Sequence, residues 1–314
     1  MIKARKKEAI YTVGHKQPDT DSICSAIAYA DFLNKTGKRA VAARTGKINP
    51  ETKFVLDYFK VKPPRLLSSV RGKKIILLDH HEKTQTPDNI EKAEIIEVID
   101  HHKIAFQYPE PILFHTEPIG STCSIIAIKY FGNSKVKLTK NIAGILLSGI
   151  LSDTVVFRSP TTTKEDIIIA KKLAQIAKIK NLEKFGIELK KKKSSLKGLS
   201  AEKIIYSDFK TYKFGKIKLG GGQVEVVDLD EIEKREKELI DKIEELARKQ
   251  KYDLLVLMAT DIIKRASKLL FWEKKNYIEK AFGKKPKENT LYLKGVMSRK
   301  KQIIPPLTRL FSKT

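Results

Sequence analysis

Apolar residues follow two spacings along the first 180 residues: short β-branched runs, and longer segments in which apolar positions recur every three or four residues. The runs expected to form strands are 9–13, 40–43, 74–78 and 94–99. The segments expected to form helices are 21–35, 52–59, 121–131, 140–151 and 162–178. Because strands and helices alternate, we predict an α/β fold with a mostly parallel sheet and helices on both of its faces.

The pattern changes near residues 180–200, where charged residues and glycines interrupt the apolar spacing. Residues 190–195 read Lys-Lys-Lys-Lys-Ser-Ser, which is typical of a linker. We therefore predict a first domain over 1–188, a linker over 189–194 and a second domain over 195–314. In the second domain the expected strands are 203–209, 212–219, 223–227, 253–258, 269–272 and 291–296, with one helix over 230–250. This pattern predicts a smaller α/β domain with a mixed sheet.

Composition indicates a globular protein, since 41% of the 314 residues are hydrophobic. The two cysteines, Cys24 and Cys123, have no metal-ligand spacing, which fits a reducing, cytoplasmic compartment. The N-terminus lacks the apolar core of a signal peptide, and the longest apolar stretch, 142–151, is too short to span a bilayer. We predict a cytoplasmic protein with no membrane partner.

The net charge of +26 comes from 63 basic and 37 acidic residues. Such an excess favours a polyanionic partner or substrate, either a nucleic acid or a small phosphate compound. A lysine-rich, heat-adapted surface accounts for it equally well, because most lysines recur at helical spacing among glutamates. Charge alone does not choose a function.

Five of the six histidines stand beside aspartates in three short clusters, each directly after an apolar run. The clusters are 13–21 (Val-Gly-His-Lys-Gln-Pro-Asp-Thr-Asp), 77–82 (Leu-Leu-Asp-His-His-Glu) and 98–102 (Val-Ile-Asp-His-His). In an open parallel sheet ligands bind beyond the carboxyl ends of the strands. The clusters are therefore expected to converge on one site, although they span ninety residues.

A fourth carboxylate, Asp153, ends an apolar helical segment, where an unpaired charge would be costly and a cation would compensate it. Two cations balance the four negative charges, and mixed imidazole–carboxylate shells suit Mn²⁺, Co²⁺ or Zn²⁺ better than Mg²⁺. Two such metals are a common device for phosphoryl displacement. The residues counted in this way are His15, Asp19, Asp21, Asp79, His101 and Asp153.

Five motifs of the chain resemble those of the DHH phosphoesterase superfamily, and within it the family II, manganese-dependent inorganic pyrophosphatases. They are the clusters around 14–23, 78–82 and 98–102, together with Glu-Pro-Ile-Gly-Ser-Thr at 117–122 and Leu-Ser-Asp-Thr-Val-Val-Phe-Arg-Ser-Pro-Thr at 151–161. A sixth, Gly-Val-Met-Ser-Arg-Lys-Lys-Gln-Ile-Ile-Pro at 295–305, is the most specific, because it lies outside the domain that the superfamily shares. The resemblance runs over nearly the full length.

The resemblance implies a role for each residue of the site. His15 and Asp19 would hold one metal, Asp21, His101 and Asp153 the other, and Asp79 would bridge them. His102 would lie beside the phosphates of the substrate, and Arg299, Lys300 and Lys191 would bind the phosphoryl group. For the lysine a shift by one residue within 190–193 stays open. The resemblance also implies two Mn²⁺ or Co²⁺ ions, a further Mg²⁺ with pyrophosphate, and a homodimer.

Two positions depart from the patterns of related enzymes. His81 stands where the simpler family members usually have asparagine, so it is a candidate further metal ligand. Gly220-Gly221-Gly222 is similar to a glycine-rich nucleic-acid motif of the DHH exonucleases, but Gln223 follows in place of histidine. We interpret this run as a local turn or bulge.

The predicted function is hydrolysis of pyrophosphate to two phosphates, with the basic second domain closing over the substrate. The alternative is a DHH-type single-strand exonuclease or short-oligonucleotide phosphodiesterase, which the positive charge and His81 favour. Nucleic-acid binding is disfavoured because such enzymes need aromatic stacking surfaces, and only 8% of the residues are aromatic. A phosphate-binding protein without activity is a third reading, disfavoured because every expected ligand type is present.

Overall fold

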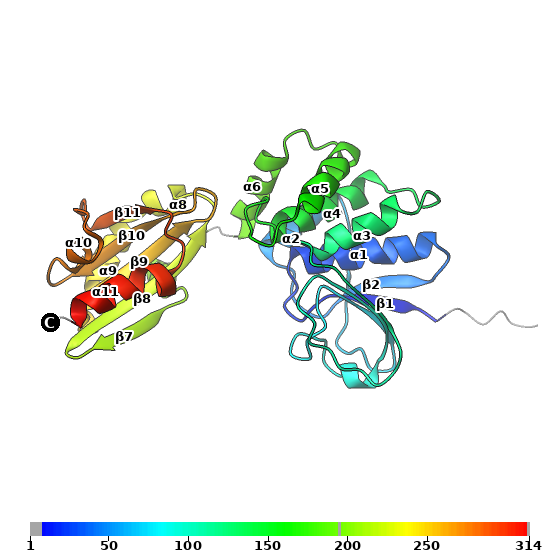
Figure 1. Cartoon of the computed structure of the whole chain (residues 1–314), viewed down its shortest axis with the longest axis horizontal. Helices are drawn as coiled ribbons and strands as arrows, with labels where there is room; N and C mark the ends of the chain where they lie inside the picture. Colours follow the sequence, from blue (N-terminus) through cyan, green and yellow to red (C-terminus); the bar gives the residue numbers. More distant parts are fainter. Residues whose placement is uncertain (1–7, 194–195, 313–314) are drawn as a thin grey trace, which may run out of the picture. The chain divides into compact units, whose positions relative to one another are not determined.

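The computed structural model describes residues 8–193 and 196–312, which form two compact units that divide between residues 193 and 194 (Figure 1). The last helix of the first unit, α6 (Leu182–Lys193), takes up residues 189–193 of the predicted linker. The linker prediction is therefore wrong over these residues. Phe185 and Leu189 lie one helical turn apart and are both buried, so they continue the helix into the lysine run. Residue 194 lies outside the described residues.

The described residues of the first unit form six parallel strands in the order β3-β2-β1-β4-β5-β6. They are β1 (Ile10–Val13), β2 (Ala40–Arg44), β3 (Arg65–Leu66), β4 (Lys74–Leu78), β5 (Glu94–Asp100) and β6 (Leu113–Thr116). The four central strands are those predicted. The two edge strands were not predicted, because they are short and each has one strand neighbour.

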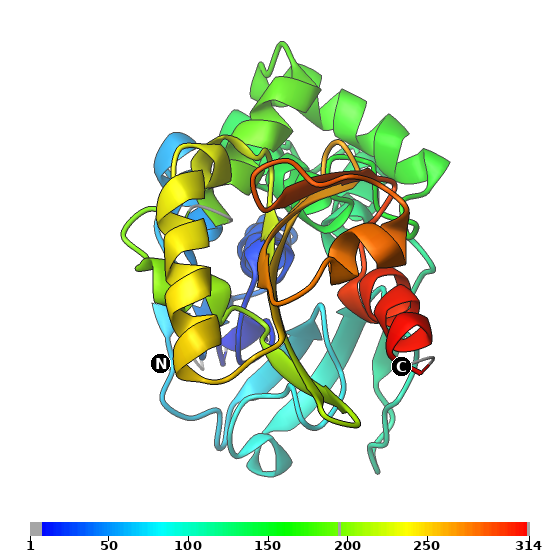
Figure 2. The ribbon, with the colours of Figure 1, turned by 90° about the vertical axis from the view of Figure 1, so that its left-hand side faces the viewer.

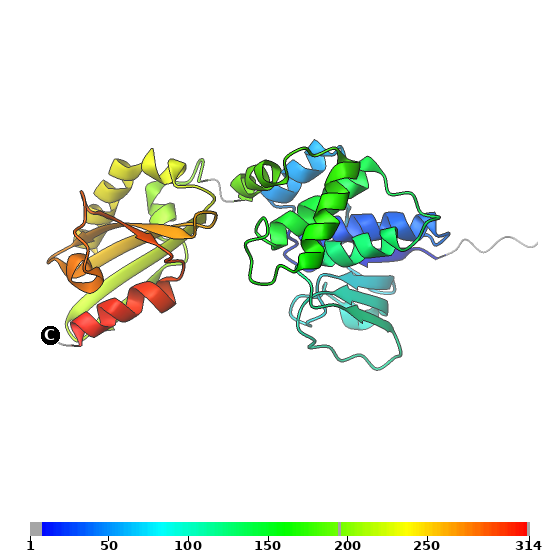
Figure 3. The ribbon, with the colours of Figure 1, turned by 45° about the horizontal axis from the view of Figure 1, so that its top comes forward.

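Within residues 8–193, six helices gather on one face of this sheet, as Figures 1 and 3 show for α1, α3 and α4. They are α1 (Thr20–Lys35), α2 (Pro50–Tyr58), α3 (Thr122–Phe131), α4 (Lys140–Asp153), α5 (Lys164–Ala177) and α6. The opposite face packs against connecting segments that include Val70, Phe106, Tyr108 and the short 3₁₀ helix η1 (Ile90–Lys92). The α/β class is confirmed, and the helical cover lies on one face, because the connections 79–93 and 101–112 lack helical apolar spacing.

The strand order reverses between β1 and its neighbour β4. From β1 the chain passes through α1 to β2 on one side, and from β4 it passes to β5 on the other side. The connections therefore diverge at this point and leave a crevice at the carboxyl ends of the two strands, which is where ligands bind in such sheets. His15 follows β1 and Asp79 follows β4, so both lie at this crevice.

The second unit contains a mixed sheet in the order β11-β10-β9-β8-β7, in which β8 and β9 are parallel and the other pairs antiparallel. Its strands are β7 (Lys210–Phe214), β8 (Ile217–Val226), β9 (Leu254–Asp261), β10 (Ala266–Glu273) and β11 (Thr290–Lys294). Its helices are α7 (Ala201–Ile205), α8 (Asp230–Glu233), α9 (Glu236–Lys249), α10 (Tyr277–Phe282) and α11 (Ile304–Phe311), with a π-helical turn η2 (Arg299–Ile303). Figure 2 shows α9 (yellow) on one face and α10 and α11 (orange and red) on the other. The predicted smaller domain with a mixed sheet is confirmed.

The strand predicted over 203–209 is wrong, because this segment begins inside α7. Ser200 caps the helix by accepting a hydrogen bond from the backbone N–H of Lys203. Ile204 and Ile205 are fully buried in the core beside α9. The secondary structure of this short isoleucine-containing segment is ambiguous from sequence alone, and burial in the tertiary structure favours a helix.

The run Gly220-Gly221-Gly222 is not a turn or bulge, because it lies inside β8, whose register is unbroken with β7 over 217–221 and with β9 over 219–226. A Cβ atom on Gly222 would lie 1.9 Å from the backbone oxygen of Ile205. Glycine at 222 therefore lets the end of α7 approach the strand. No described helix of either unit is long and apolar enough to cross a membrane.

We expect Gly222→Ala to destabilise the protein by about 3 kcal/mol, because a rigid backbone oxygen must move to admit the methyl group. Gly221→Ala is the matched control, since its Cβ would lie 3.3 Å from the Cδ atom of Arg299, a contact that a shift of a few tenths of an ångström relieves. Urea unfolding followed by circular dichroism measures both variants. Equal stability of the two variants would contradict the packing argument.

Candidate active site

The first cluster lies in the loop between β1 and α1. Asp19 caps α1 by accepting a hydrogen bond of 3.0 Å from the backbone N–H of Ser22, and Asp21 lies in the first turn. The Ser22 hydroxyl accepts a hydrogen bond from the backbone N–H of His15. A Cβ on Gly14 would lie 1.8 Å from that hydroxyl oxygen, so glycine is needed for the loop to pass so close to the helix.

Two strained backbone segments present carboxylates of the site. Asp79, which directly follows β4, has a positive φ of 65° and is almost fully buried. Asp153 ends α4, and the three residues Val155–Phe157 soon after it have φ between 48° and 65°. Left-handed conformations cost branched residues roughly 1–2 kcal/mol each. Such strain clusters at functional sites, where the surrounding structure holds it in place.

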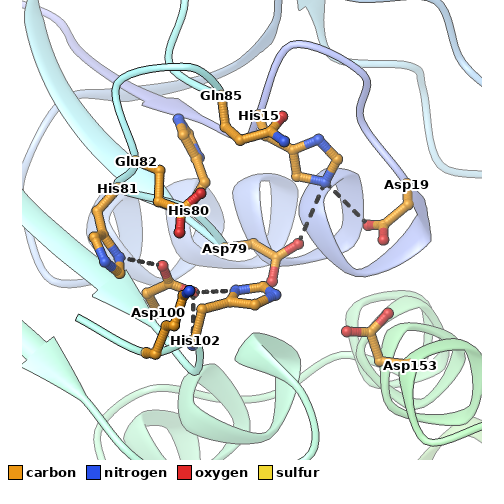
Figure 4. A pocket seen from close by; sticks show the side chains of 11 residues that line it. His15, Asp19, Asp79, His80, His81, Glu82, Gln85, Asp100, His102 and Asp153 are labelled. Carbon is orange, nitrogen blue, oxygen red and sulfur yellow. Dashed lines mark hydrogen bonds and ion pairs between the residues drawn. The ribbon is translucent and has the colours of Figure 1, made fainter. Parts of the chain in front are cut away.

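The three clusters and Asp153 come together in the first unit, as Figure 4 shows for most of these side chains. Potential ligand atoms of His15, Asp19 and Asp79 lie within 4.8 Å of one another, and so do those of Asp21, Asp79, His101 and Asp153. A third group joins His102 to Asp79 and His101. Asp79 belongs to all three groups, so it lies between the two sets of ligands that sequence reasoning separated.

The spacing inside these groups leaves room for cations. His15 Nε2 lies 3.7 Å from Asp79 Oδ2, and His101 Nε2 lies 3.4 Å from Asp79 Oδ1 and 3.3 Å from Asp153 Oδ2. The Nδ1 atom of His101 lies 2.9 Å from the backbone oxygen of Ile119, which leaves the lone pair of Nε2 facing the carboxylates. This Nε2 atom is buried and has no hydrogen-bond partner among the described residues, so the donor set fits a transition metal.

The electrostatics of the site show the cost of keeping these carboxylates together. Burial, and then the charge of Asp21, raises the pKa of Asp79 well above its usual value. The same two causes raise the pKa of Asp153 to about 7. Burial alone would lower the pKa of His101, but the neighbouring carboxylates of Asp153 and Asp79 raise it. The metal-free site therefore holds protons that a bound cation would displace.

Sequence reasoning did not assign a role to the segment that orients these ligands, residues 119–123. Asp21 accepts hydrogen bonds from the Ser121 hydroxyl at 2.6 Å and from the backbone N–H of Thr122 at 2.7 Å. The Thr122 hydroxyl donates to Asp79 Oδ1 at 3.0 Å. The segment is the N-terminus of α3, whose positive dipole stabilises the Asp21 carboxylate. The sequence feature that could have predicted this helix N-terminus is Ser121, a typical N-cap residue directly before the apolar helical segment.

A cavity of about 220 Å³ opens beside the ligands. This volume is below the usual 300–1,000 Å³ of pockets for drug-sized molecules, so the cavity suits a small ligand. Its lining comprises His15, Asp19, Asp79, His80, His81, Glu82, Gln85, Asp100, His102, Lys103 and Asp153. His102 is the half-exposed member, with its Nδ1 atom 2.8 Å from Asp100 Oδ1.

The hydrogen bonds of His81 argue against the prediction that it is a further metal ligand. Its Nδ1 atom lies 2.5 Å from Asp100 Oδ2, and its Nε2 atom accepts a hydrogen bond of 2.9 Å from the backbone N–H of Ala105. Both ring nitrogens are thus engaged by the protein, and His81 belongs to none of the three ligand groups formed by the described residues. Coordination would require breaking one of these bonds.

The predicted phosphate-binding residues lie in both units. Lys191 is exposed on α6 of the first unit, whereas Arg299 and Lys300 open η2 of the second. The Arg299 guanidinium is buried, and its Nη1 donates to the backbone oxygens of Gly221, at 3.0 Å, and of Asp208. Strand register pairs Lys210 with Gly221, so the fold places a further lysine close to Arg299.

Comparison with known proteins agrees with this geometry. Residues 9–150 match the model of the DHH family N-terminal domain, and residues 187–310 match that of the DHHA2 domain. The chain is 48% identical over 309 residues to the manganese-dependent inorganic pyrophosphatase of Methanocaldococcus jannaschii, covering 96% of this chain and 99% of the relative. The enzyme of the same name from Bacillus subtilis is 42% identical over 305 residues, covering 96% and 98% of the two chains.

A solved structure from Methanococcus jannaschii, described as a family II inorganic pyrophosphatase, is 48% identical with a TM-score of 0.63, and covers 96% of this chain and 99% of that one. An exopolyphosphatase-related protein from Bacteroides fragilis, at 16% identity and a TM-score of 0.50, shares the fold over 98% of this chain and 93% of its own. With both domain models matched and relatives at 48% identity over almost the whole length, the chain belongs to the family of manganese-dependent inorganic pyrophosphatases in the DHH superfamily.

Proposed function

We propose that this protein hydrolyses inorganic pyrophosphate to two phosphates at the cavity of the first unit. The observation that carries the proposal is the position of Asp79 in every ligand group, because it gives two adjacent cation sites one shared carboxylate. Paired metal sites of this kind serve displacement at phosphorus. Family membership narrows the substrate from phosphate esters in general to pyrophosphate.

In the proposed arrangement His15 and Asp19 would hold one Mn²⁺ ion, Asp21, His101 and Asp153 would hold the other, and Asp79 would be a ligand of both. When bound, the ions would lower the pKa of water and offset the charge of the phosphates. The hydroxyls of Ser121 and Thr122 donate to Asp21 and Asp79, and the backbone oxygen of Ile119 accepts from Nδ1 of His101. These hydrogen bonds would orient the three ligands. Closure of the second unit over the substrate would exclude water.

His102 is proposed to bind the phosphates through its Nε2 atom. Its Nδ1–H donates to Asp100, and this hydrogen bond is the main cause that raises the pKa of His102 above its usual 6.5. A larger fraction of His102 is therefore protonated, so its Nε2 can donate to a phosphate oxygen or to a leaving phosphate.

Phosphate release from pyrophosphate in the presence of Mn²⁺ tests this function. A labelled single-stranded oligonucleotide serves as the competing substrate under the same conditions. Release from pyrophosphate with the oligonucleotide intact is the expected result. Degradation of the oligonucleotide with inert pyrophosphate would favour the exonuclease reading.

We expect Arg299→Ala to lower kcat/KM by roughly 100-fold, since it removes a cation that can bind two phosphate oxygens at once. Lys300→Ala should act in the same direction through loss of a point charge. Lys301→Ala is the matched control, because it removes a neighbouring exposed lysine outside the proposed phosphate site. Steady-state kinetics with a check of the unfolding midpoint separate lost binding from lost stability. Unchanged kinetics in Arg299→Ala would contradict the proposal that Arg299 binds the phosphoryl group.

The lysine that binds the phosphoryl group together with Arg299 and Lys300 can be identified by the same steady-state kinetics. Lys191 stays the prediction from resemblance, and Lys210 is the candidate that the register with Gly221 adds. We also infer from family membership a homodimer in the cytoplasm, with Co²⁺ as an alternative metal and Mg²⁺ accompanying the substrate. Light scattering of the purified protein and metal-dependent assays measure the dimer and the metals.

A further inference from the structure

His81, which lines the cavity, is hydrogen-bonded both to Asp100 at the end of β5 and to the backbone of Ala105 in the segment that follows β5. Its side chain is fully buried, and the rings of Phe106 and Phe114 pack edge-on against it. The Nδ1 atom faces Asp100 Oδ2, and the Nε2 atom accepts from the backbone N–H of Ala105. Because Nε2 accepts, the ring carries its proton on Nδ1 and donates it to Asp100.

Asp100, which accepts the hydrogen bond from His81, also contacts His101 and His102. It is fully buried at the end of β5 and accepts through its other oxygen from the backbone N–H groups of His101 and His102, at 2.7 and 3.2 Å, and from His102 Nδ1 at 2.8 Å. The carboxylate therefore joins the His81 ring to the His102 ring. With one oxygen held by His81, the carboxylate has a single orientation for His102.

The geometry points to His81 as a positioning residue: we propose that it fixes the Asp100 carboxylate and the Ala105 backbone, and thereby the orientation of His102 towards the phosphates. This inference rests on the proposed function for the role of His102. It assigns His81 a role without metal coordination. The His101 ring has its own hydrogen bond to the backbone oxygen of Ile119, so we expect metal binding to depend little on His81.

The two bonds of His81 can be tested separately with two substitutions. The amide nitrogen of asparagine occupies about the position of histidine Nδ1, so His81→Asn keeps a donor for Asp100 and loses the acceptor for Ala105. The amide oxygen of glutamine reaches about the position of Nε2, so His81→Gln keeps the acceptor for Ala105 and loses the donor for Asp100. His81→Phe removes both bonds and retains an aromatic ring of similar size.

Three measurements on the full-length protein distinguish the variants. Hydrogen–deuterium exchange of the peptide over 103–108 should accelerate about tenfold in His81→Asn and His81→Phe and stay near the parent rate in His81→Gln. The kcat for pyrophosphate should fall about tenfold or more in His81→Gln and His81→Phe, and less in His81→Asn. The affinity for Mn²⁺ without substrate should change less than about threefold in all three.

A loss of Mn²⁺ affinity of tenfold or more in every variant would overturn the proposal, because it would make His81 a ligand. An unchanged exchange rate at 103–108 in His81→Asn would also overturn it, since the hydrogen bond from Ala105 to His81 would then not stabilise this backbone segment. The exchange and Mn²⁺ measurements do not depend on turnover, so failure of the proposed pyrophosphatase activity would appear separately, as an inactive parent protein. If His81→Phe fails to fold, the asparagine and glutamine variants still decide the outcome.

Discussion

Asp79→Asn is expected to lower kcat for pyrophosphate by at least about 1,000-fold at saturating Mn²⁺. The substitution preserves the size of the side chain and removes one negative charge from the centre of the site. Asp79 is the residue that the ligand groups of His15 and of Asp153 have in common, so both cation sites lose a carboxylate. A neutral amide binds Mn²⁺ poorly compared with a carboxylate.

Asp88→Asn is the matched control for this variant. Asp88 pairs with Lys16 near the same crevice but its side chain is 78% exposed, so its loss should leave kcat within about twofold. Single-turnover assays at rising Mn²⁺ concentration distinguish weaker metal binding from a slower chemical step. Recovery of the parent rate in Asp79→Asn at high Mn²⁺ would show that the bridge contributes to binding alone.

Removing Mn²⁺ is expected to abolish activity and to reverse the pH dependence of stability. In the metal-free protein the pKa of Asp153 is about 7, compared with about 3.9 in an unfolded chain. Between these values the folded state holds a proton that the unfolded state has lost. Its stability therefore falls as the pH rises from about 4 through 7, and it is greatest below this window.

Mn²⁺ binding has the opposite pH dependence, because the cation displaces these protons. One proton displaced corresponds to about a tenfold gain in affinity per pH unit, so the gain between pH 6 and 7 should be tenfold or somewhat less as Asp153 titrates, and larger if His101 also releases a proton. The Mn²⁺-induced rise in unfolding midpoint should grow over the same interval. Calorimetry in two buffers of different ionisation enthalpy counts the protons released.

Asp153→Asn provides the control for this linkage. It removes a group whose pKa is raised, so fewer protons should be released on Mn²⁺ binding. A midpoint shift that is independent of pH would show that the ligands are already deprotonated in the metal-free protein. The calorimetric count would then be close to zero.

Local patterns predicted much of the fold and of the candidate site. The apolar runs before His15, Asp79 and Asp100 form β1, β4 and β5, and they end within one residue of the prediction. The helix expected over 162–178 forms as α5 (Lys164–Ala177), and Thr163 and Asp166 make a capping box at its N-terminus. These features depend on spacing and hydrogen bonds between near neighbours, which a sequence carries directly.

Contacts between distant segments explain the errors. The isoleucines 204 and 205 form a helix because they pack beneath α9. Gly222 lies in a strand, where the missing side chain leaves space for the backbone oxygen of Ile205. His81 was a candidate ligand because it stands beside Asp79, yet its ring bonds to Asp100 and Ala105. Which way a side chain points after a strand ends depends on partners far away in the sequence.

The sequence by itself determined that imidazoles and carboxylates follow several strands, that their charge calls for two cations, and that the motifs are those of one family. The tertiary structure decided which of these side chains meet. Parallel pairing of β1 with β4 and β4 with β5 brings His15, Asp79 and His101 to one edge, and Asp153 reaches them because α4 packs along α1. A cation site needs several ligand atoms within a few ångströms, and only long-range packing sets those distances.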